Sequence, residues 1–155
     1  MATLNSRKEE GRDKLVGTWK LLSASLSTAG GERNEAPFGL SPAGFLTYTQ
    51  EGRMAAMISY SRRKPLSVLD LPLASVEEKA EAFSTFLAYS GRYTLMEDKV
   101  IHHVEVSSIQ NWTGTDLVRL IRFQGDRIIL VTLPTSIGEK IQTWELIWER
   151  APANS

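Results

Sequence analysis

The stretch KLVGTWKLLSAS, residues 14–25, places a Gly-Thr-Trp where a run of alternating apolar and polar residues begins. Such alternation predicts a β-strand with one buried face, because neighbouring side chains in a strand point to opposite sides. Near the other end of the chain, TWELIWER at residues 143–150 carries a second strand signal and ends in an arginine. If these two strands pair, they close the sheet on itself.

Between these stretches the chain repeats a strand–turn–strand pattern. Tight turns at Glu51-Gly52, at Asp98 and at residues 124–126 each separate two alternating apolar runs. The predicted strands are TWKLLSASLS, AGFLTYTQ, RMAAMISYS, GRYTLME, KVIHHVEVS, TDLVRLIRF, RIILVTLP and KIQTWELIWER. About eight strands suit an antiparallel up-and-down β-barrel, so the predicted fold class is all-β, mainly β.

One segment, residues 75–91, has helical periodicity instead. Its apolar residues recur at the spacing of one helix face: Val76, Ala80, Phe83 and Leu87. Ser75 and Glu78 form a capping box, and Gly91 follows the expected end. The pattern predicts a helix of roughly 14 residues between the third and fourth strands, covering one side or the mouth of the barrel.

The composition predicts one domain over residues 1–155, with a polar N-terminal segment at 1–13 and a tail at 151–155. Lys and Arg together number 18, as do Asp and Glu, so nothing in the charge favours nucleic acid or an anionic membrane as partner. The basic cluster at residues 62–64 is interpreted as a solvated loop. The chain has no cysteine, which excludes disulfides and thiolate nucleophiles. With no apolar leader and no membrane-length apolar run, we expect a cytoplasmic protein.

Gly17-Thr18-Trp19 and Arg150 resemble the lipocalin signature, in which the tryptophan packs across the closed end of an eight-stranded barrel beneath an arginine from the last strand. The chain from about Leu15 to Arg150 is similar to the lipocalin-like domain family of bacteria and fungi. The matching pieces are LVGTWKLLS, GFLTYTQEGRMAAMI, FLAYSGRYTL, VIHHVE, NWTGTDLVR and IWER. The resemblance implies a lipocalin-type barrel. The mid-chain helix and the lack of cysteines depart from secreted lipocalins, so transport in plasma is not expected.

Strand parity gives several strands a mostly apolar face that carries one polar residue. These faces are Trp144, Leu146, Trp148 and Arg150; Val100, His102, Val104 and Val106; and Leu117, Arg119, Ile121 and Phe123. Apolar walls with a few polar groups are typical of a ligand-binding lumen.

His102 and His103 point to opposite faces of their strand and therefore do not chelate one ion. His103 shares a face with Glu105, but the chain has two histidines in all, so an outward polar face is expected and no metal or cofactor is predicted. His102 is expected to point inward. There it is either an acid or base for a bound substrate or a core histidine bonded to backbone or to a tyrosine hydroxyl.

Arg119 needs an acceptor if it is buried. A ligand carboxylate, enolate or phenolate would satisfy it, and so would a salt bridge to Glu105 or Glu145. Other candidate ligand contacts are hydroxyls, adaptable apolar walls and residues at the rim of the barrel: Tyr48, Tyr60, Tyr89, Tyr93, Met54, Asn111, Trp112, Trp144 and Trp148.

Three functions follow. Lipocalin-like folds in secondary-metabolite pathways include cofactor-free cyclases and isomerases, so the resemblance implies first an enzyme acting on a hydrophobic polyketide or terpenoid. His102 would shuttle a proton, Arg119 would stabilise negative charge, and Tyr48 or Tyr60 would orient a carbonyl. The alternative is a non-catalytic carrier of a small hydrophobic molecule. The third is a barrel filled by its own side chains. Exposed strand edges or an apolar helix surface could support a homodimer, but nothing in the sequence requires one.

Overall fold

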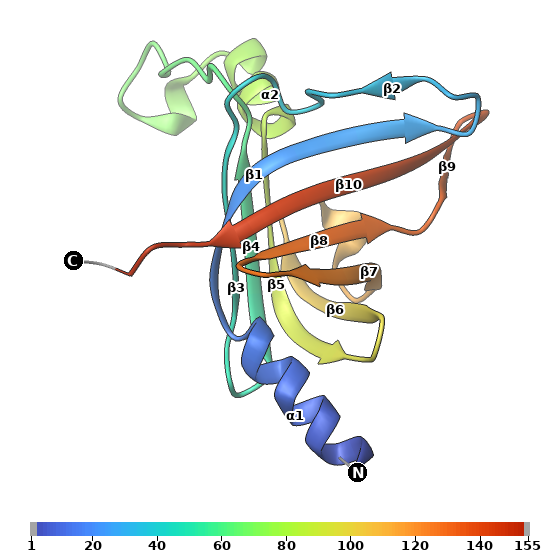
Figure 1. The fold of residues 1–155 in the computed structure, drawn as a ribbon. Helices are drawn as coiled ribbons and strands as arrows, with labels where there is room; N and C mark the ends of the chain where they lie inside the picture. The colour runs from blue at the N-terminus through green and yellow to red at the C-terminus, as the bar shows by residue number, and fades with distance from the viewer. Residues whose placement is uncertain (1–2, 154–155) are drawn as a thin grey trace.

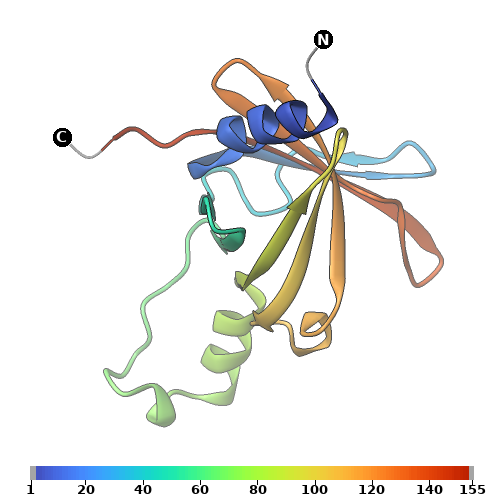
Figure 2. The ribbon, with the colours of Figure 1, turned by 90° about the horizontal axis from the view of Figure 1, so that it is seen from below.

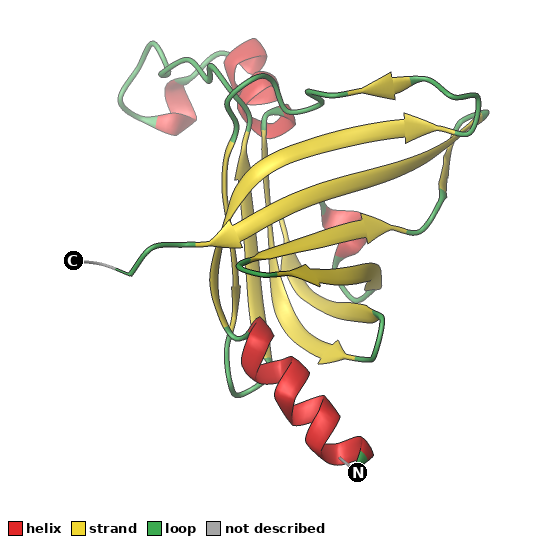
Figure 3. Cartoon of the chain, in the orientation of Figure 1, coloured by secondary structure: helices red, strands yellow, loops and turns green. Residues whose placement is uncertain are grey.

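A computed structural model of the chain describes residues 3–153. Residues 1–2 and 154–155, the outer ends of the predicted segment 1–13 and tail 151–155, lie outside the described residues. The main strands are β1 (Gly17–Thr28), β3 (Ala43–Tyr48), β4 (Arg53–Ser59), β5 (Phe86–Leu95), β6 (Lys99–Ser107), β7 (Asp116–Gln124), β8 (Arg127–Thr132) and β10 (Lys140–Arg150). The shorter elements are β2 (Arg33–Asn34), β9 (Thr135–Ile137) and the 3₁₀ turns η1 (Leu71–Leu73) and η2 (Gln110–Trp112). The helices are α1 (Leu4–Leu15) and α2 (Val76–Ser84), which lie at opposite ends of the barrel (Figure 1, Figure 3).

The eight main strands form one antiparallel sheet in the order β1-β3-β4-β5-β6-β7-β8-β10, and β10 pairs back onto β1 to close it. Apart from the two short strands β2 and β9, each strand pairs with the next along the chain (Figure 1). This confirms the predicted up-and-down barrel of lipocalin type. Within residues 3–153, no helix combines the length and apolar character needed to cross a membrane.

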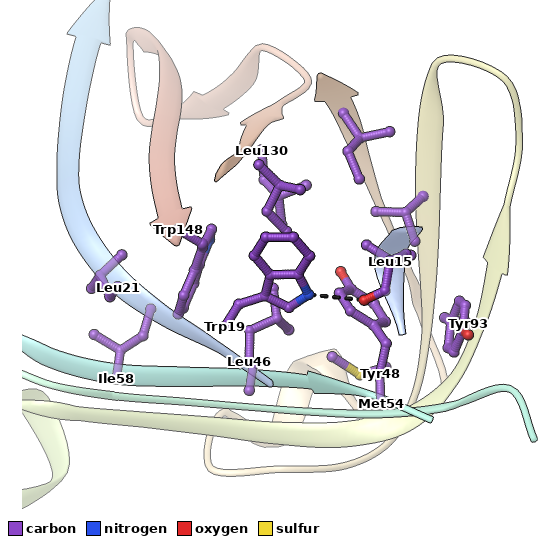
Figure 4. Packing of buried hydrophobic residues seen from close by; sticks show 14 of the residues in the cluster. Leu15, Trp19, Leu21, Leu46, Tyr48, Met54, Ile58, Tyr93, Leu130 and Trp148 are labelled. Carbon is purple, nitrogen blue, oxygen red and sulfur yellow. Dashed lines mark hydrogen bonds between the residues drawn. The ribbon is translucent and has the colours of Figure 1, made fainter. Parts of the chain in front are cut away.

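The Gly-Thr-Trp of the first strand meets Arg150 where the barrel closes. Trp19 and Arg150 are direct partners in the β1–β10 ladder, and the guanidinium carbon lies 4.4 Å from the indole centroid. The Trp19 Nε1 donates to the Leu15 carbonyl at 2.8 Å (Figure 4). Arg150 also donates to the carbonyl of Val16 at 2.6 Å and to the carbonyl of Lys14. We call these contacts the closing seam.

Helix α1 was not predicted, because its sequence has no apolar face. Leu15 is its one buried residue, Gly11 and Arg12 are half-buried, and the remaining residues are exposed. The Thr3 side chain caps it by accepting from the Ser6 amide at 3.4 Å. The Arg12 guanidinium lies 5.6 Å from the Tyr93 ring centroid, which places α1 at the end of the barrel that the closing seam seals (Figure 2). The helix is held by Leu15, by the contact of Arg12 with Tyr93, and by the hydrogen bonds of the closing seam to its last backbone carbonyls, and such contacts leave no periodic signal.

The mid-chain helix lies between the third and fourth main strands and has the predicted capping box at Ser75 and Glu78. Its predicted length of roughly 14 residues was wrong, because α2 has 9 residues and ends at Ser84. The remainder, from Phe86 through Gly91, belongs to β5, where pairing with β4 and β6 overrides the helical spacing. None of the residues of α2 is buried, so its apolar side chains do not form an inward face.

A β-bulge interrupts the pairing of β5 with β6. Gly91 pairs with Val104 and Ser90 with Val106, so Glu105 is the extra residue. The bulge reverses which side chains point inward beyond it, and for that reason the predicted inward position of Val106 was wrong: its side chain is 62% exposed. His102, on the other side of the bulge, keeps its inward position and is 1% exposed.

Candidate ligand cavity

The barrel contains a cavity of about 520 Å³, a size typical of drug-sized ligand sites. Its wall comes from all eight main strands except β1, together with β9, η2 and the loop after β2. Its aromatic lining residues are Phe38, Tyr60, Tyr89, Trp112, Trp144 and Trp148. The remaining lining residues are Leu46, Ala56, Ile58, Leu87, His102, Ile109, Leu117, Arg119, Leu130, Thr132, Thr135, Ile137 and Leu146. A second hollow of similar size lies beside α2, but it opens broadly to solvent and its charged groups are surface side chains.

Aromatic rings form the wall in contacting pairs. Phe38 stacks on Trp144 with centroids 5.2 Å apart and 22° between the planes, and its ring also lies 4.9 Å from that of Tyr60. Tyr89 meets the edge of Trp112 at 5.7 Å. Aromatic pairs prefer such stacked and edge-to-face arrangements. The cavity therefore presents flat aromatic faces that suit a planar ligand.

His102 lies between two tyrosines in the cavity wall. The Tyr48 hydroxyl is 2.7 Å from His102 Nε2, and the Tyr89 hydroxyl is 2.9 Å from Nδ1. Burial lowers the pKa of His102 to about 3, with further lowering by the charges of Arg119 and His103. The imidazole is therefore neutral near pH 7, and both of its nitrogens are already hydrogen-bonded.

The Arg119 side chain lines the same cavity, and its positive charge acts on the hydroxyls of both Tyr48 and Tyr89. Burial raises the pKa of both tyrosines, and the positive charge of Arg119 opposes that rise. Arg119 Nη1 donates to the Val118 carbonyl at 3.2 Å. Among residues 3–153 no carboxylate lies within ion-pair distance of this guanidinium.

The two carboxylates that could have paired with Arg119 are engaged elsewhere. Glu105 pairs with Arg53 and, at 3.6 Å, with Arg92. Glu145 pairs with Arg122 at 3.8 Å. The structure therefore does not form the predicted alternative of a salt bridge from Arg119 to Glu105 or Glu145.

The structure brings together most of the predicted site residues. Seven of the predicted residues line the cavity: His102, Arg119, Tyr60, Tyr89, Trp112, Trp144 and Trp148. Tyr48 reaches the site through His102. Met54 and Tyr93 instead pack in the core near the closing seam, and the Tyr93 hydroxyl donates to the Thr49 carbonyl at 2.7 Å (Figure 4). Asn111 is exposed on η2.

Phe38, Ala56, Ile58 and Leu130 line the wall and were not predicted to do so. Strand parity could have found Ala56 and Ile58, because both alternate with more exposed neighbours in β4. Leu130 follows two other buried residues in β8, so burial alone does not distinguish its face. Phe38 lies in a long loop that has no periodicity, so no local signal was available. Its position is fixed by its contacts with Tyr60 and Trp144.

Thr94, His103 and Asp116 form a hydrogen-bonded row on the outside of the barrel, in the order of a catalytic triad, but they line neither cavity. His103 contacts Thr94 Oγ1 at 2.8 Å and Asp116 Oδ1 at 2.7 Å. Thr94 and Asp116 are exposed, and neither cavity includes them. These are cross-strand contacts over β5, β6 and β7. In the described part of the chain no three His, Asp or Glu side chains gather in a way that could hold a metal ion.

The buried His102 predicts a pH-dependent stability. The pKa falls from 6.5 in the unfolded chain to about 3 in the fold, so the unfolded chain binds more protons between these values and acid destabilises the fold. We expect the free energy of unfolding to fall by up to about 1.4 kcal/mol per unit as pH drops below about 6.5, with no dependence on this group above it. Urea denaturation at a series of pH values measures this.

His102→Gln should flatten that slope, whereas His103→Gln, on the outer face, should retain it. Hydrogen bonds from the backbone amides of Ser67 and Ser75 lower the pKa of Glu78 from its ordinary value of 4.5 to about 2. Glu78 therefore contributes to the acid sensitivity of the fold only below about pH 4.5. The interval from pH 6.5 to 4.5 therefore separates the two groups. An unchanged slope in His102→Gln would contradict the prediction.

Comparison with known proteins adds a family and a relative. The family model described as a lipocalin-like domain matches residues 16–151. A protein of Aspergillus oryzae named 4'-hydroxy-3'-methoxypropiophenone carrier protein ppsC is 39% identical over 85 aligned positions, which cover 49% of this chain and 77% of that protein. No solved structure matches this chain.

Proposed function

This chain belongs to the lipocalin-like domain family, and from that premise we propose that it is a non-catalytic carrier that binds a small, flat, hydrophobic molecule inside its barrel. The observation that carries the proposal is the cavity of about 520 Å³ with its aromatic walls. An enclosed apolar surface of this kind favours transfer of a hydrophobic molecule out of water. The relative named as a carrier of 4'-hydroxy-3'-methoxypropiophenone supports a small aromatic cargo.

The state of His102 favours a carrier over a cyclase or isomerase. A general base works best when its pKa lies near the operating pH, and the pKa of His102 is about 3. Tyr48 and Tyr89 also occupy both ring nitrogens, so a substrate would have to displace one of them to reach the imidazole. Catalysis by His102, Arg119 and Tyr48 stays a prediction from the resemblance, and the cavity geometry supports binding better.

The test uses a neutral apolar dye, Nile red, and a pair of matched variants. Ala56 lines the cavity, whereas the adjacent Ala55 does not. We expect the natural chain to bind Nile red at one site with enhanced fluorescence. Ala56→Phe should fill the cavity and weaken binding about tenfold or more, while Ala55→Phe should leave the affinity unchanged.

Two results would overturn the carrier proposal. One is the absence of saturable dye binding by the natural chain. The other is equal binding by Ala56→Phe and the natural chain, which would place the dye outside the barrel. Circular dichroism of both variants checks that each is folded.

A further inference from the structure

We infer that the polar end of the cavity binds an ionised oxygen of the ligand, a phenolate or enolate on a planar conjugated ring, between the Arg119 guanidinium and the Tyr89 hydroxyl. The cavity would then select the ionised form of an acidic ligand over its protonated form. This inference rests on the proposed function, because it requires a small molecule inside the barrel.

The hydrogen bond between Tyr48 and His102 has one satisfactory direction. Tyr48 is 1% exposed, and in the described chain its hydroxyl has His102 Nε2 as its one partner. If Nε2 carried the proton and donated it to Tyr48, the hydroxyl hydrogen of Tyr48 would be buried without an acceptor. An unsatisfied buried donor is costly. Tyr48 therefore donates to Nε2, and the neutral imidazole carries its proton on Nδ1.

The position of the imidazole proton sets the role of Tyr89. Because Nδ1 carries the proton, it donates to the Tyr89 oxygen over the 2.9 Å between them. That oxygen becomes an acceptor in this contact, and its own hydrogen has no partner among the described residues. Tyr89 lines the cavity, so this hydrogen is available to a ligand acceptor. The tyrosine–histidine–tyrosine chain thus makes Tyr89 a donor toward the ligand.

The side chains at this end of the cavity carry a net positive charge. Arg119 is the one charged side chain among the described lining residues. His102 is neutral, and burial raises the pKa of Tyr48 and Tyr89, so both hydroxyls stay protonated near pH 7. No carboxylate in residues 3–153 pairs with Arg119. A guanidinium next to protonated donors, with no protein anion beside it, favours a ligand anion.

The other polar groups of the wall carry no charge. Trp148 Nε1 has no hydrogen-bond partner among the described residues, but the atom is fully buried, so a ligand in the cavity does not reach it. Thr132 Oγ1 accepts from the Trp144 amide at 2.9 Å and keeps its own hydrogen as a neutral donor, whereas Thr135 Oγ1 donates to the Leu133 carbonyl at 3.0 Å. The aromatic faces of the wall then select a conjugated ring behind the charged oxygen.

The experiment uses 4-nitrophenol, because its phenolate absorbs visible light and its phenol form does not. The dye is titrated with pH in the presence of saturating protein. We expect the bound dye to ionise at a pH about 1–3 units lower than the free dye, the range that an adjacent opposite charge produces. Arg119→Met should remove most of this shift, and Arg119→Lys should keep a larger part of it.

Arg122→Met is the matched control, because Arg122 lies on the same strand but is exposed and pairs with Glu145. It should retain the full shift. Tyr89→Phe should reduce the shift, since it removes the second donor but not the charge. Far-ultraviolet circular dichroism and urea midpoints establish that each variant folds.

The results separate this inference from the proposed function. If Nile red and the neutral analogue 4-nitroanisole bind but bound 4-nitrophenol ionises at the pH of the free dye, the inference is overturned and the carrier remains. An equal shift in Arg119→Met and the natural chain also overturns it. If none of the three probes binds, the carrier proposal fails and the inference fails with it.

Discussion

Replacing Gly91 with alanine is expected to lower the free energy of unfolding by about 3 kcal/mol or more. A Cβ atom at this position would lie 1.9 Å from the His103 carbonyl oxygen and 3.0 Å from the Glu105 amide nitrogen. Both are backbone atoms of β6, so they cannot move away without breaking the β5–β6 ladder. Urea denaturation followed by circular dichroism measures the loss.

Gly30→Ala is the matched control for this substitution. Its Cβ would meet nothing closer than Thr28 Oγ1 at 3.9 Å, and Gly30 lies in an exposed turn. We expect that change to stay within about 0.5 kcal/mol. Equal stabilities for Gly91→Ala and Gly30→Ala would mean that the bulge is not packed as described. Because the bulge sets the inward face of β6, Gly91→Ala should also weaken dye binding.

The second large effect is expected at the closing seam. Trp19→Ala should cost about 3–5 kcal/mol, because it removes one of the largest fully buried side chains in the described chain and leaves a cavity behind. It also removes the hydrogen bond to the Leu15 carbonyl and the surface on which Arg150 stacks. Thermal and urea unfolding at pH 7 measure the loss.

A double-mutant cycle tests whether the two seam residues act together. Trp19→Leu, Arg150→Met and the double variant should show a coupling energy of about 0.5–2 kcal/mol, since each single change removes the same cation–π contact. Arg92→Met, which removes an exposed arginine paired with Glu105 at 3.6 Å, should change stability little. A coupling energy of zero would contradict the seam as the element that joins the two ends of the sheet.

The strands were predictable because their signals are local. The predicted strands KVIHHVEVS and KIQTWELIWER coincide with β6 and β10, and in both the alternation of side chains is strong. Parity within these strands also placed His102, Trp144 and Trp148 on the inward face. The pairing of Trp19 with Arg150 was predicted from the family resemblance, and the β1–β10 register confirms it.

The elements that were missed depend on contacts distant in sequence. FLAYSG satisfies a helical spacing as well as a strand, and only its pairing with β4 and β6 selects the strand. The Val106 side chain is exposed because of a β-bulge that the local sequence pattern does not indicate. Helix α1 has one buried residue, so hydrophobic periodicity does not predict that it packs against the barrel.

By itself the sequence determined the eight strands and their largely apolar inward faces, because alternation is a local property of each strand. The closure of the sheet through Trp19 and Arg150 was predicted from the family resemblance. Only the tertiary structure decided which side chains meet inside. It placed His102 between Tyr48 and Tyr89, left Arg119 without a carboxylate among the described residues, and made Phe38 part of the wall. These arrangements depend on the register between strands and on loop positions. Both are set by packing of the whole barrel, which no single segment encodes.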